Sequence, residues 1–529
     1  MFEHFRGADT AGTPGERGGQ AGAQLSRRGL LLLGGAGLAA PLLAALPSSS
    51  SPVGAAPLAT RGDDDDLPTP RDYGAKGNGR NDDTRALQRF IDATARRGVV
   101  GVVPRGTYRC TSSLLVPAGA RFHLEAGSLL LKDWAAPAGL LDALLRNADL
   151  AVPSSRVRIT GPGSIGARDH SRTGVLIGLY GHDVLLSDFT INTYAGGQAI
   201  MYGGDRGRIH RVTVENSAPE FGTGGIRVFG GTDFLGTDCH VESGDDCFQF
   251  VPIGNPEAEP SLYDQSITHG SFVGCTGASS QSRFLVAILE WTGGENSMSA
   301  VIEDCSFSDC HGSAAGRGIG VKNTHSSGAI QRLSFTDCSV AVPTAADEQS
   351  QGIRVQTGSE FGGAIRDVVF TRTDILDPVN SPMRIGGPNI SGLTFDGCTF
   401  TAPSGAAPTI VVVDGTDRTR FHDCTFVGAP GKRPLVVGPV NPVTGLSVED
   451  CRFTGIDGGW AVDLVRASGA RITGSTFQAA PGSPTTRAIR VAPGSSAVVI
   501  EGNDVTGISH AEPVTDRALD TVLSGNQGA

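Results

Sequence analysis

The sequence predicts an all-β chain that folds as a parallel β-helix, a solenoid of about 12 or more rungs. Three observations carry this prediction: a short motif that recurs along the chain, apolar pairs that recur with it, and a composition rich in turn residues. A period of a few tens of residues is typical of stacked repeats, in which each unit packs on its neighbours. Short period-two strands between turns indicate a β-solenoid rung and not a helical repeat.

The recurring motif is Asp-Cys or a close variant of it. Its copies are Asp238-Cys239, Asp304-Cys305, Asp337-Cys338, Gly397-Cys398, Asp423-Cys424 and Asp450-Cys451. Apolar pairs, with one residue between their members, return with the motif. They begin at Val175, Ile200, Ile226, Phe248, Leu285, Ile319, Ile353, Met383, Ile410, Leu435, Val462 and Ile489. Successive pairs are 22 to 37 residues apart, and each interval supplies one rung.

The composition suits such a fold and excludes one class of partner. The chain has 75 glycines in 529 residues and only 18 % charged residues, which favours tight turns between stacked strands. A solenoid grows by adding rungs, so this length does not require several globular domains. The formal charge of −11 disfavours a nucleic-acid partner, because nucleic-acid-binding surfaces are basic.

Residues 1–55 are predicted to be an export signal and not part of the fold. Arg27-Arg28 precedes an apolar run from Leu30 to Leu46 and resembles a bacterial twin-arginine signal. The run is short and interrupted by Gly and Pro, which disfavours a stable membrane span. Residues 56–70, with four consecutive aspartates, are predicted to be a disordered acidic linker. The protein is therefore expected outside the cytoplasm, secreted or extracytoplasmic, with no membrane association after cleavage of the signal.

Six of the ten cysteines share one position of the repeat, at 239, 305, 338, 398, 424 and 451. Stacked strands lie about 4.8 Å apart, so these side chains are expected to form an inward ladder of buried thiols. Disulfides between adjacent rungs are the alternative, with Cys247 and Cys275 the best candidates for one bridge. No C-x-x-C or Cys/His cluster indicates a metal, so no metal site is expected.

Residues 83–97 are predicted to form a helix that covers the first rung of the solenoid. Leu87, Phe90 and Ile91 recur at helical spacing, and Gly98 would end the helix. A solenoid needs such a cap, because its terminal rung has no neighbour on one side. The solenoid itself is expected to occupy residues 71–529.

The N-terminal motifs resemble those of the pectate lyase superfamily, which includes the polygalacturonases of glycoside hydrolase family 28. They are Asp72-Tyr73-Gly74-Ala75-Lys76-Gly77-Asn78-Gly79, Asn81-Asp82-Asp83-Thr84, and Pro104 followed by Gly106-Thr107-Tyr108. The resemblance covers about forty residues and implies a right-handed parallel β-helix. It leaves activity open, because the superfamily contains hydrolases, lyases, epimerases and phage tail parts.

The candidate catalytic site begins with Asp245 and Asp246 in the stretch Ser243-Gly244-Asp245-Asp246-Cys247. This stretch is similar to the Gly-Asp-Asp-Cys motif of family 28, where the resemblance implies that the two aspartates act as general base and general acid. Hydrolysis needs one protonated carboxyl and one ionised carboxylate, and two close carboxylates tend to separate their pKa values. The alternative is a structural turn, in which the aspartates cap backbone amides.

Other motifs of family 28 are carried poorly. The preceding rung has Gly224 where the family has a carboxylate, and Ser282-Arg283 stands where the family has Gly-His-Gly. Lys322 matches the lysine that the family motif implies for a substrate carboxylate, although a solvated lysine is equally compatible with the sequence. His269 falls at a different side of the rung and is expected to be structural.

Further candidates lie on neighbouring rungs. Glu290 ends the strand after the acid pair and is a third candidate catalytic carboxylate, at the spacing that suits glycosidases. Trp291 beside it is a candidate sugar platform, or else edge packing. The candidate substrate-binding cations are Arg283, Arg317, Lys322 and Arg354, which suit a uronate or sulfate-bearing sugar. The same arginines would equally suit a surface ion-pair ladder.

Three functions compete at this stage. The first is a secreted glycoside hydrolase that acts on an acidic or plant-type polysaccharide without a cofactor. The second is a polysaccharide lyase, in which Asp245, Asp246 and Glu242 would hold Ca²⁺ and Arg283 or Lys322 would abstract a proton. The third is a β-helix that binds glycans or builds assemblies without catalysis. In each case the expected partner is a polysaccharide or oligosaccharide.

Overall fold

A computed structural model of the chain describes residues 67–135, 142–171, 174–253, 262–289, 299–344, 351–405, 407–483, 485–510, 512–518 and 520–528. The chain divides into two compact units, Met1–Asp63 and Asp64–Ala529, and every described residue belongs to the second. The predicted export signal and residues 56–66 of the predicted linker lie outside the described residues. Across the described ranges, no helix combines the length and apolarity that a membrane span requires.

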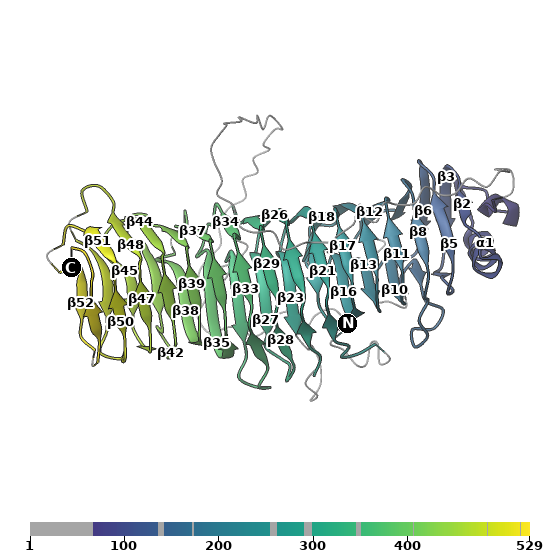
Figure 1. Ribbon diagram of the computed structural model, residues 1–529. Helices are drawn as coiled ribbons and strands as arrows, with labels where there is room; N and C mark the ends of the chain where they lie inside the picture. The colour runs from purple at the N-terminus through teal and green to yellow at the C-terminus, as the bar shows by residue number, and fades with distance from the viewer. Residues whose placement is uncertain are drawn as a thin grey trace, which may run out of the picture. The chain divides into compact units, whose positions relative to one another are not determined.

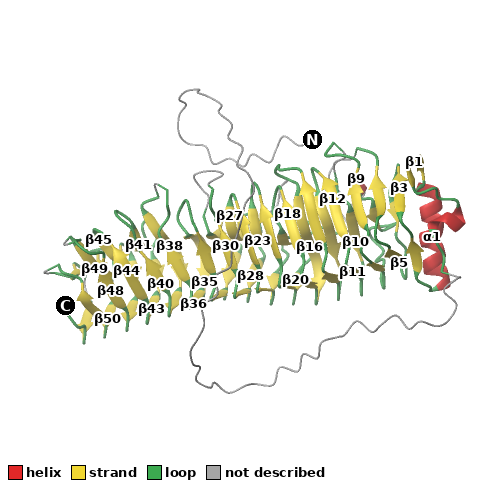
Figure 2. Ribbon diagram, turned by 90° about the horizontal axis from the view of Figure 1, so that it is seen from above, coloured by secondary structure: helices red, strands yellow, loops and turns green. Residues whose placement is uncertain are grey.

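The second unit is a parallel β-helix, as the sequence predicts. Three parallel sheets, called sheets A, B and C, run side by side along one axis, and each rung adds to all three (Figures 1 and 2). One turn of the chain follows β23, β24, β25 and β26, and β27 starts the next turn on top of β23. Their bounds follow with the sheets to which they belong.

Sheet A contains sixteen strands in the described residues. They are β1 (Asn78–Asp82), β3 (Gly106–Cys110), β6 (Ser128–Lys132), β9 (Ser164–Ala167), β12 (Thr190–Tyr194), β15 (Thr213–Ser217), β18 (His240–Ser243), β22 (Thr276–Ser279), β26 (His311–Ala314), β30 (Ser339–Ala341), β34 (Asp374–Leu376), β37 (Thr399–Thr401), β40 (Thr425–Val427), β44 (Arg452–Ile456), β48 (Thr476–Ala479) and β51 (Asp504–Gly507).

Sheet B also contains sixteen strands in the described ranges. They are β2 (Gly101–Val103), β5 (Arg121–Leu124), β8 (Arg158–Thr160), β11 (Leu185–Ser187), β14 (Arg208–His210), β17 (Leu235–Thr237), β21 (Ser271–Val273), β25 (Ser306–Ser308), β29 (Ser334–Thr336), β33 (Val369–Thr371), β36 (Thr394–Asp396), β39 (Arg420–His422), β43 (Ser447–Glu449), β47 (Arg471–Thr473), β50 (Val499–Glu501) and β53 (Val522–Ser524).

Sheet C carries the predicted site. Its strands are β4 (Leu114–Leu115), β7 (Leu145–Arg146), β10 (Ile177–Tyr180), β13 (Gln198–Gly203), β16 (Gly224–Thr232), β19 (Phe248–Phe250), β20 (Ile267–Thr268), β23 (Arg283–Leu289), β24 (Ile302–Glu303), β27 (Arg317–Asn323), β28 (Ala329–Gln331), β31 (Ile353–Thr357), β32 (Ala364–Arg366), β35 (Met383–Ser391), β38 (Thr409–Asp417), β41 (Arg433–Val437), β42 (Val443–Thr444), β45 (Gly459–Leu464), β46 (Ala467–Ser468), β49 (Thr486–Val491) and β52 (Val514–Asp516).

The core is a set of side-chain ladders that run through the rungs. In sheet B, phenylalanines 307, 335, 370, 395 and 421 stack in register, with ring centroids 4.8–5.0 Å apart and ring planes 4–14° apart. Their separation equals the spacing of parallel strands, so each ring lies flat on the ring of the rung before it. Apolar burial along such ladders is the main stabilising contribution in a solenoid.

All ten cysteines are buried and none is in a disulfide. The thiol ladder follows the strands of sheet B, and its members are Cys239, Cys275, Cys310, Cys338, Cys398, Cys424 and Cys451. The predicted membership is therefore wrong at Cys305, which lies in the turn between sheets C and B. Cys275, predicted as a bridge candidate, belongs to the ladder, and Cys247 lies apart from it beside the acid pair.

The geometry of the turns explains both the motif and the wrong assignment. The residue before each ladder thiol has a left-handed backbone, as at Asp238 (φ 53°) and Gly274 (φ 65°), and Asp and Gly tolerate this conformation. The turn between sheets C and B uses the same device at Asp304 (φ 53°), one residue before Cys305. Two different corners of the rung therefore produce the same dipeptide.

The predicted capping helix is confirmed as α1 (Thr84–Arg97), which follows the 3₁₀ helix η2 (Pro70–Tyr73). Leu87, Phe90 and Ile91 are fully buried and cover the first rung, where the Phe90 ring lies 6.2 Å from that of Phe122. Gly98 ends the helix in a left-handed conformation (φ 65°). The helix shields the interior at the N-terminal edge of the sheets.

Candidate functional site

The predicted acid pair lies in the turn that joins β18 of sheet A to β19 of sheet C. The amide of Asp245 donates to the carbonyl oxygen of Thr223 at 2.8 Å, which ties the turn to the preceding rung. A Cβ atom on Gly244 would lie 2.3 Å from the carbonyl oxygen of Ala218, so a side chain has no room there. Glycine thus lets this turn sit close to its neighbour and present two carboxyl groups on consecutive residues.

Asp246 is held by the rung that follows it. Its Oδ1 accepts hydrogen bonds from the Ser282 hydroxyl (2.7 Å) and the Arg283 amide (3.1 Å), and Nη1 of Arg283 lies 3.2 Å from its Oδ2. The residue is only 8 % exposed. A buried carboxylate needs such donors and a counter-charge, and the sequence supplies both as Ser282-Arg283. The position that lacks the family's Gly-His-Gly therefore carries the partner of the acid.

Asp245 has weaker support and a different protonation behaviour. It is half-buried, and its Oδ2 accepts one hydrogen bond from the Gly222 amide (2.9 Å). Burial, and after it the neighbouring charge of Asp246, raise the pKa of Asp245 to about 6. Asp245 therefore exchanges its proton near pH 6, while Asp246 is in an ion pair with Arg283. This separation is the one that acid–base catalysis needs.

Arg227 is a further charged residue near the acid pair, and it is not among the residues predicted from the sequence. It lies in β16, and its guanidinium donates to the carbonyl oxygens of Val251 (2.7 Å) and Pro252 (2.6 Å). Burial lowers its pKa to about 10, while the charges of Asp246 and Asp245 act to raise it. In the sequence, Arg227 stands between Ile226 and Val228, two apolar residues that point into the core. Its positive charge lies within electrostatic reach of the acid pair.

The structure explains the missing carboxylate at Gly224. Gln198, opposite Gly224 in the preceding strand, fills the space, and a Cβ atom on Gly224 would lie 2.1 Å from its Oε1. That oxygen accepts a hydrogen bond from Nε2 of Gln249 at 2.7 Å, and the same nitrogen lies 2.7 Å from the carbonyl oxygen of Asp246. Two amides thus form the wall beside the pair in place of a third carboxylate.

The predicted substrate-binding cations lie on β23, β27 and β31, the three strands that stack in turn on β19 in sheet C. Arg283 and Arg317 are directly opposite each other in β23 and β27. Arg354 pairs with Gly320 in the register of β31, and its Nε donates to Gln356 at 2.9 Å. Lys322 lies opposite Gln356 in the same pair of strands. The four cations are half-buried and extend over three consecutive rungs of sheet C.

Glu290 and Trp291, the predicted third carboxylate and the predicted sugar platform, lie outside the described residues. So does the segment 254–261, which follows the strand next to the acid pair. The described part of the site therefore consists of the acid pair, its arginines and the amide wall.

The calcium alternative requires Asp245, Asp246 and Glu242 to converge, and they do not. Glu242 is an exposed residue of sheet A, and its carboxylate lies 3.7 Å from Nε2 of His240. Among the described residues, no group of three His, Cys, Asp or Glu side chains is arranged to hold a metal ion. Arg283, one of the two candidate bases of that alternative beside Lys322, is the ion-pair partner of Asp246. These residues do not fit a calcium site.

A groove of about 370 Å³ runs beside the acid pair, along the ends of β18, β22, β26 and β30. Its walls include Glu242, Ser243, Ser279, Ser313 and Pro343. The Ser243 hydroxyl donates to the carbonyl oxygen of Asp245 at 2.6 Å, so the groove reaches the backbone of the pair. Small hydroxyl and apolar side chains line it, as suits the mixed surface of a saccharide.

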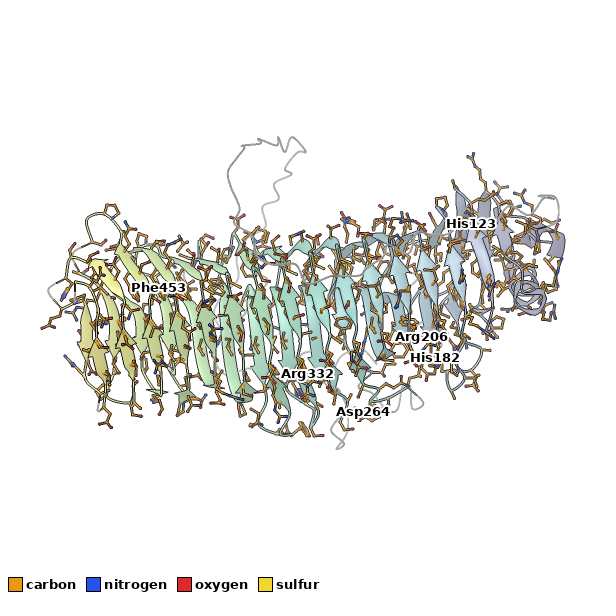
Figure 3. The ribbon with its side chains drawn as sticks, viewed as in Figure 1. His123, His182, Arg206, Asp264, Arg332 and Phe453 are labelled. Atoms are coloured by element: carbon orange, nitrogen blue, oxygen red, sulfur yellow. The ribbon has the colours of Figure 1, made fainter. Side chains whose placement is uncertain are left out.

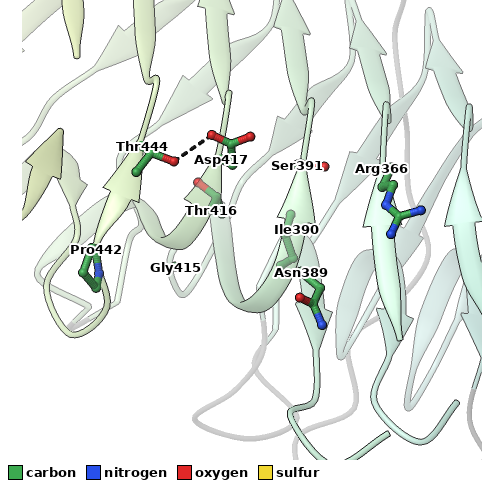
Figure 4. A pocket seen from close by; sticks show the side chains of 9 residues that line it. All are labelled: Arg366, Asn389, Ile390, Ser391, Gly415, Thr416, Asp417, Pro442 and Thr444. Carbon is green, nitrogen blue, oxygen red and sulfur yellow. Dashed lines mark hydrogen bonds between the residues drawn. The ribbon is translucent and has the colours of Figure 1, made fainter. Parts of the chain in front are cut away.

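A second pocket, of about 430 Å³, lies near the turns between sheets C and B of later rungs (Figure 4). It is lined by Arg366, Asn389, Asp417 and Thr444 among others, and the Thr444 hydroxyl donates to Asp417 at 2.7 Å. It contains one carboxylate and no acid pair, so the chemistry of hydrolysis has no counterpart there.

A ladder of surface ion pairs is also present in the described residues. It follows the turns between sheets C and B, where Arg206 pairs with Asp183 at 2.7 Å and Arg332 pairs with Asp304 at 2.8 Å (Figure 3). In these pairs one arginine of a rung meets one aspartate of the rung before it, on the exposed surface. Such pairs contribute little stability each, and they leave no excess of positive charge.

Comparison with known proteins is consistent with this fold. The sequence model of the family described as "Rhamnogalacturonase A/epimerase, pectate lyase-like" matches residues 70–123, the region of the predicted motifs. No curated protein sequence matches the chain significantly. The resemblance to the pectate lyase superfamily is thus confirmed over the N-terminal cap and first strands.

Solved structures extend the resemblance along the chain. The tailspike protein of Escherichia coli bacteriophage HK620, solved in complex with a pentasaccharide, is 12 % identical with a TM-score of 0.52, covering 86 % of this chain and 80 % of its own. The family 28 exopolygalacturonase of Yersinia enterocolitica is 15 % identical (TM-score 0.44; 80 % and 78 % covered). Tailspike protein 3 of bacteriophage CBA120 is 13 % identical (TM-score 0.43). The match covers 88 % of this chain and 62 % of the length of that protein. The fold is a right-handed parallel β-helix.

Proposed function

We propose that this protein is a secreted glycoside hydrolase that acts on an acidic or plant-type polysaccharide. Asp245 donates a proton to the leaving oxygen, and Asp246 is the carboxylate that activates water. The observation that carries the proposal is the unequal pair itself: burial raises the pKa of Asp245 to about 6, and Asp246 forms an ion pair with Arg283. Asp245 thus holds a proton below about pH 6, and Asp246 is held by a guanidinium beside it.

The positive charge around the pair supports an acidic substrate. Arg283, Arg317, Lys322 and Arg354 lie on consecutive rungs of sheet C beside the acids. Guanidinium groups bind carboxylates in a fixed bidentate geometry, which suits a uronate. The tailspike match, whose structure holds a pentasaccharide, is a protein of the same fold that takes a sugar chain.

Product analysis tests this proposal. The protein is incubated with polygalacturonate, rhamnogalacturonan and neutral glycans, with and without a chelator. Hydrolysis predicts new reducing ends that do not absorb ultraviolet light, from the wild type and not from Asp245→Asn or Asp246→Asn. Absorbing unsaturated ends that disappear with the chelator would instead indicate a lyase and overturn the proposal.

The burial of Asp246 favours a second candidate, a β-helix that binds glycans without catalysis. A carboxylate that is 8 % exposed and held by three donors is also a sound structural ion pair. Absence of products across the glycan panel, together with saturable binding of one glycan, would select this candidate.

Export is part of the proposal. The twin arginines at 27–28 and the apolar run after them support translocation and cleavage before residue 56. Expression in a bacterium with a functional twin-arginine pathway, and in a strain without it, tests this step. Mature protein with a new N-terminus near residue 56 is expected outside the cytoplasm of the first strain alone.

A further inference from the structure

A second carboxylate lies buried on the outer side of sheet C, far from the acid pair. Asp463 in β45 is 1 % exposed and contacts two arginines from the strands on either side. Nε of Arg490 donates to its Oδ1 at 2.7 Å, and Nη1 of Arg433 lies 3.6 Å from its Oδ2. Asp463 and Arg490 are directly opposite in register. The cluster thus spans β41, β45 and β49.

An aromatic ring adjoins this cluster. The guanidinium of Arg487 lies 4.8 Å from the ring centroid of Trp460, and the two residues are opposite each other in β49 and β45. Nε of Arg487 also donates to Nε2 of His510 at 3.0 Å. The register that pairs Leu435 with Val462, continued by two residues, places Arg433 opposite Trp460. Arginine, tryptophan and arginine therefore follow one another across three rungs.

The charges of this cluster do not balance. Arg433 and Arg490 share a single carboxylate, and Arg487, which stacks on Trp460, makes no ion pair in the described part of the chain. The side chain of Asp463 is 2 % exposed, whereas those of Arg433 and Arg490 are 44 % and 37 % exposed. The carboxylate therefore orients the guanidiniums from below, and their outer faces meet solvent. The one-to-one surface pairs, such as Arg206 with Asp183, show no such excess.

This arrangement matches the chemistry of a uronate sugar. Guanidiniums bind carboxylates by paired hydrogen bonds, and the part of the half-buried Trp460 indole that Arg487 does not cover is apolar surface for a sugar. A neutral sugar would use the ring alone, and a small inorganic anion would use the arginines alone. The combination favours a ligand that carries a ring and a carboxylate together.

The cluster shares a sheet with the acid pair. Register pairs connect Gln249 in β19, the strand that follows the acid pair, to Asp463 in β45 through seven strand spacings. At about 4.8 Å for each spacing, the acid pair and the Asp463 cluster lie roughly 34 Å apart along the sheet. A short oligosaccharide cannot reach both, but a polysaccharide laid along sheet C can.

We propose that Arg433, Trp460, Arg487 and Arg490 form a non-catalytic binding site for a uronate-bearing polysaccharide, which holds a distant part of the same polymer that the acid pair cleaves. The identity of the polymer rests on the proposed function, whereas the site itself rests on the cluster. Holding a chain at two places raises its apparent affinity without a new contact at either place.

Binding of polygalacturonate to the mature protein tests the proposal, measured by titration calorimetry in an Asp246→Asn background so that the polymer stays intact. Trp460→Ala combined with Arg487→Gln is expected to weaken polygalacturonate binding about tenfold or more. In the hydrolytically active protein, the same two changes should leave turnover of trigalacturonate as it was. Arg471→Gln removes an exposed arginine from sheet B of the same turn and should change neither measurement.

The controls separate this inference from the proposed hydrolase. Trp460→Phe keeps an aromatic face and should recover much of the binding, and thermal unfolding checks that each variant is folded. If Trp460→Ala unfolds the protein, Arg487→Gln alone gives the test, because Arg487 is only half-buried and glutamine keeps a hydrogen-bond donor for His510. Unchanged polymer binding in the variants, equal loss for a neutral galactan, or no polymer binding by the wild type overturns the inference. Polymer binding that depends on Trp460, with no products from the wild type, overturns the hydrolase alone.

Discussion

Sheet C carries two buried aspartates that arginines contact, and their surroundings differ. At Asp246 the partner is buried as deeply as the acid, with side-chain exposures of 15 % for Arg283 and 11 % for Asp246. At Asp463 the acid is buried and the arginines are more than a third exposed. A second carboxyl of raised pKa stands beside Asp246, and an indole ring stands near Asp463. The same ion pair therefore suits chemistry in one place and binding in the other.

The largest expected effect separates the two aspartates by activity. Asp246→Asn should lower hydrolysis of polygalacturonate by about 10²–10⁴-fold, because it removes a group that exchanges protons in the reaction. Asp463→Asn, a chemically identical change in the other cluster, should leave turnover of a short oligogalacturonate within about twofold. Reducing-end assays on both variants check this. Equal losses in the two variants would mean that both effects come from folding, and the distinction would fail.

Asp463 should matter for stability although it matters little for activity. Asp463→Ala leaves Arg433 and Arg490 without their shared counter-ion, which is expected to lower the free energy of unfolding by about 2 kcal/mol. This lies below the value for a fully buried pair, because both arginines keep contact with water. Urea unfolding measures the change. Glu501→Ala, an exposed acid on sheet B, is the control and should alter stability by less than about 0.5 kcal/mol.

Asp245 should make the stability of the protein depend on pH. Its pKa is about 6 in the folded chain against an ordinary value of 3.8, so between these values the unfolded chain loses the proton first. Stability contributed by the protonated carboxyl is present below about pH 4 and is lost as pH rises to 6, on the order of 3 kcal/mol. Unfolding of wild type and Asp245→Asn at pH 4 to 7 checks this.

The free energy of unfolding of Asp245→Asn should not decline between pH 4 and 6. Above pH 6 it should change with pH in parallel with that of the wild type. Hydrolysis by the wild type should fall above about pH 6, since the donor proton is then lost. Two stability curves of the same shape would show that Asp245 titrates normally and would remove it as the acid.

The smallest effect concerns the amide wall beside the acid pair. Gly224→Ala places a methyl group against the Gln198 side chain and should cost about 1 kcal/mol, because that flexible chain must move. Gln198→Ala should relieve the cost, so the double variant should be more stable than the sum of the single changes predicts. Thermal unfolding of the four proteins gives the coupling. Strict additivity would show that Gln198 does not occupy this space.

The sequence was sufficient for the fold and for the position of the acid pair. Spacing of apolar pairs gives the rungs directly, but register fails where an extra apolar residue is available: strands align at Ile177 and Val411, and the predicted pairs begin at Val175 and Ile410. The thiol ladder was assigned one wrong member because Asp304-Cys305 repeats the dipeptide at another corner. The local sequence does not show whether such a dipeptide lies in the turn between sheets C and B or in the turn between sheets B and A.

The site was harder to predict because its partners come from other rungs. Ser282 and Arg283 were seen as a departure from a family motif, whereas they hold Asp246. The cluster around Asp463 was missed altogether, since its rungs are short and regular and its residues are 27 positions apart. Only the stacking of strands shows that these residues meet.

The nearly parallel stacking of the phenylalanine rings has one more consequence. Neighbouring strands in open sheets usually rotate by about 20–25°, and rings on such strands would tilt by a similar amount. The ring planes of Phe335, Phe370 and Phe395 differ by only 5–7° from one rung to the next. Over these rungs, successive strands of sheet B are therefore almost pure translations of one another. A stiff, straight polysaccharide would therefore contact both the acid pair and the cluster around Asp463 without bending.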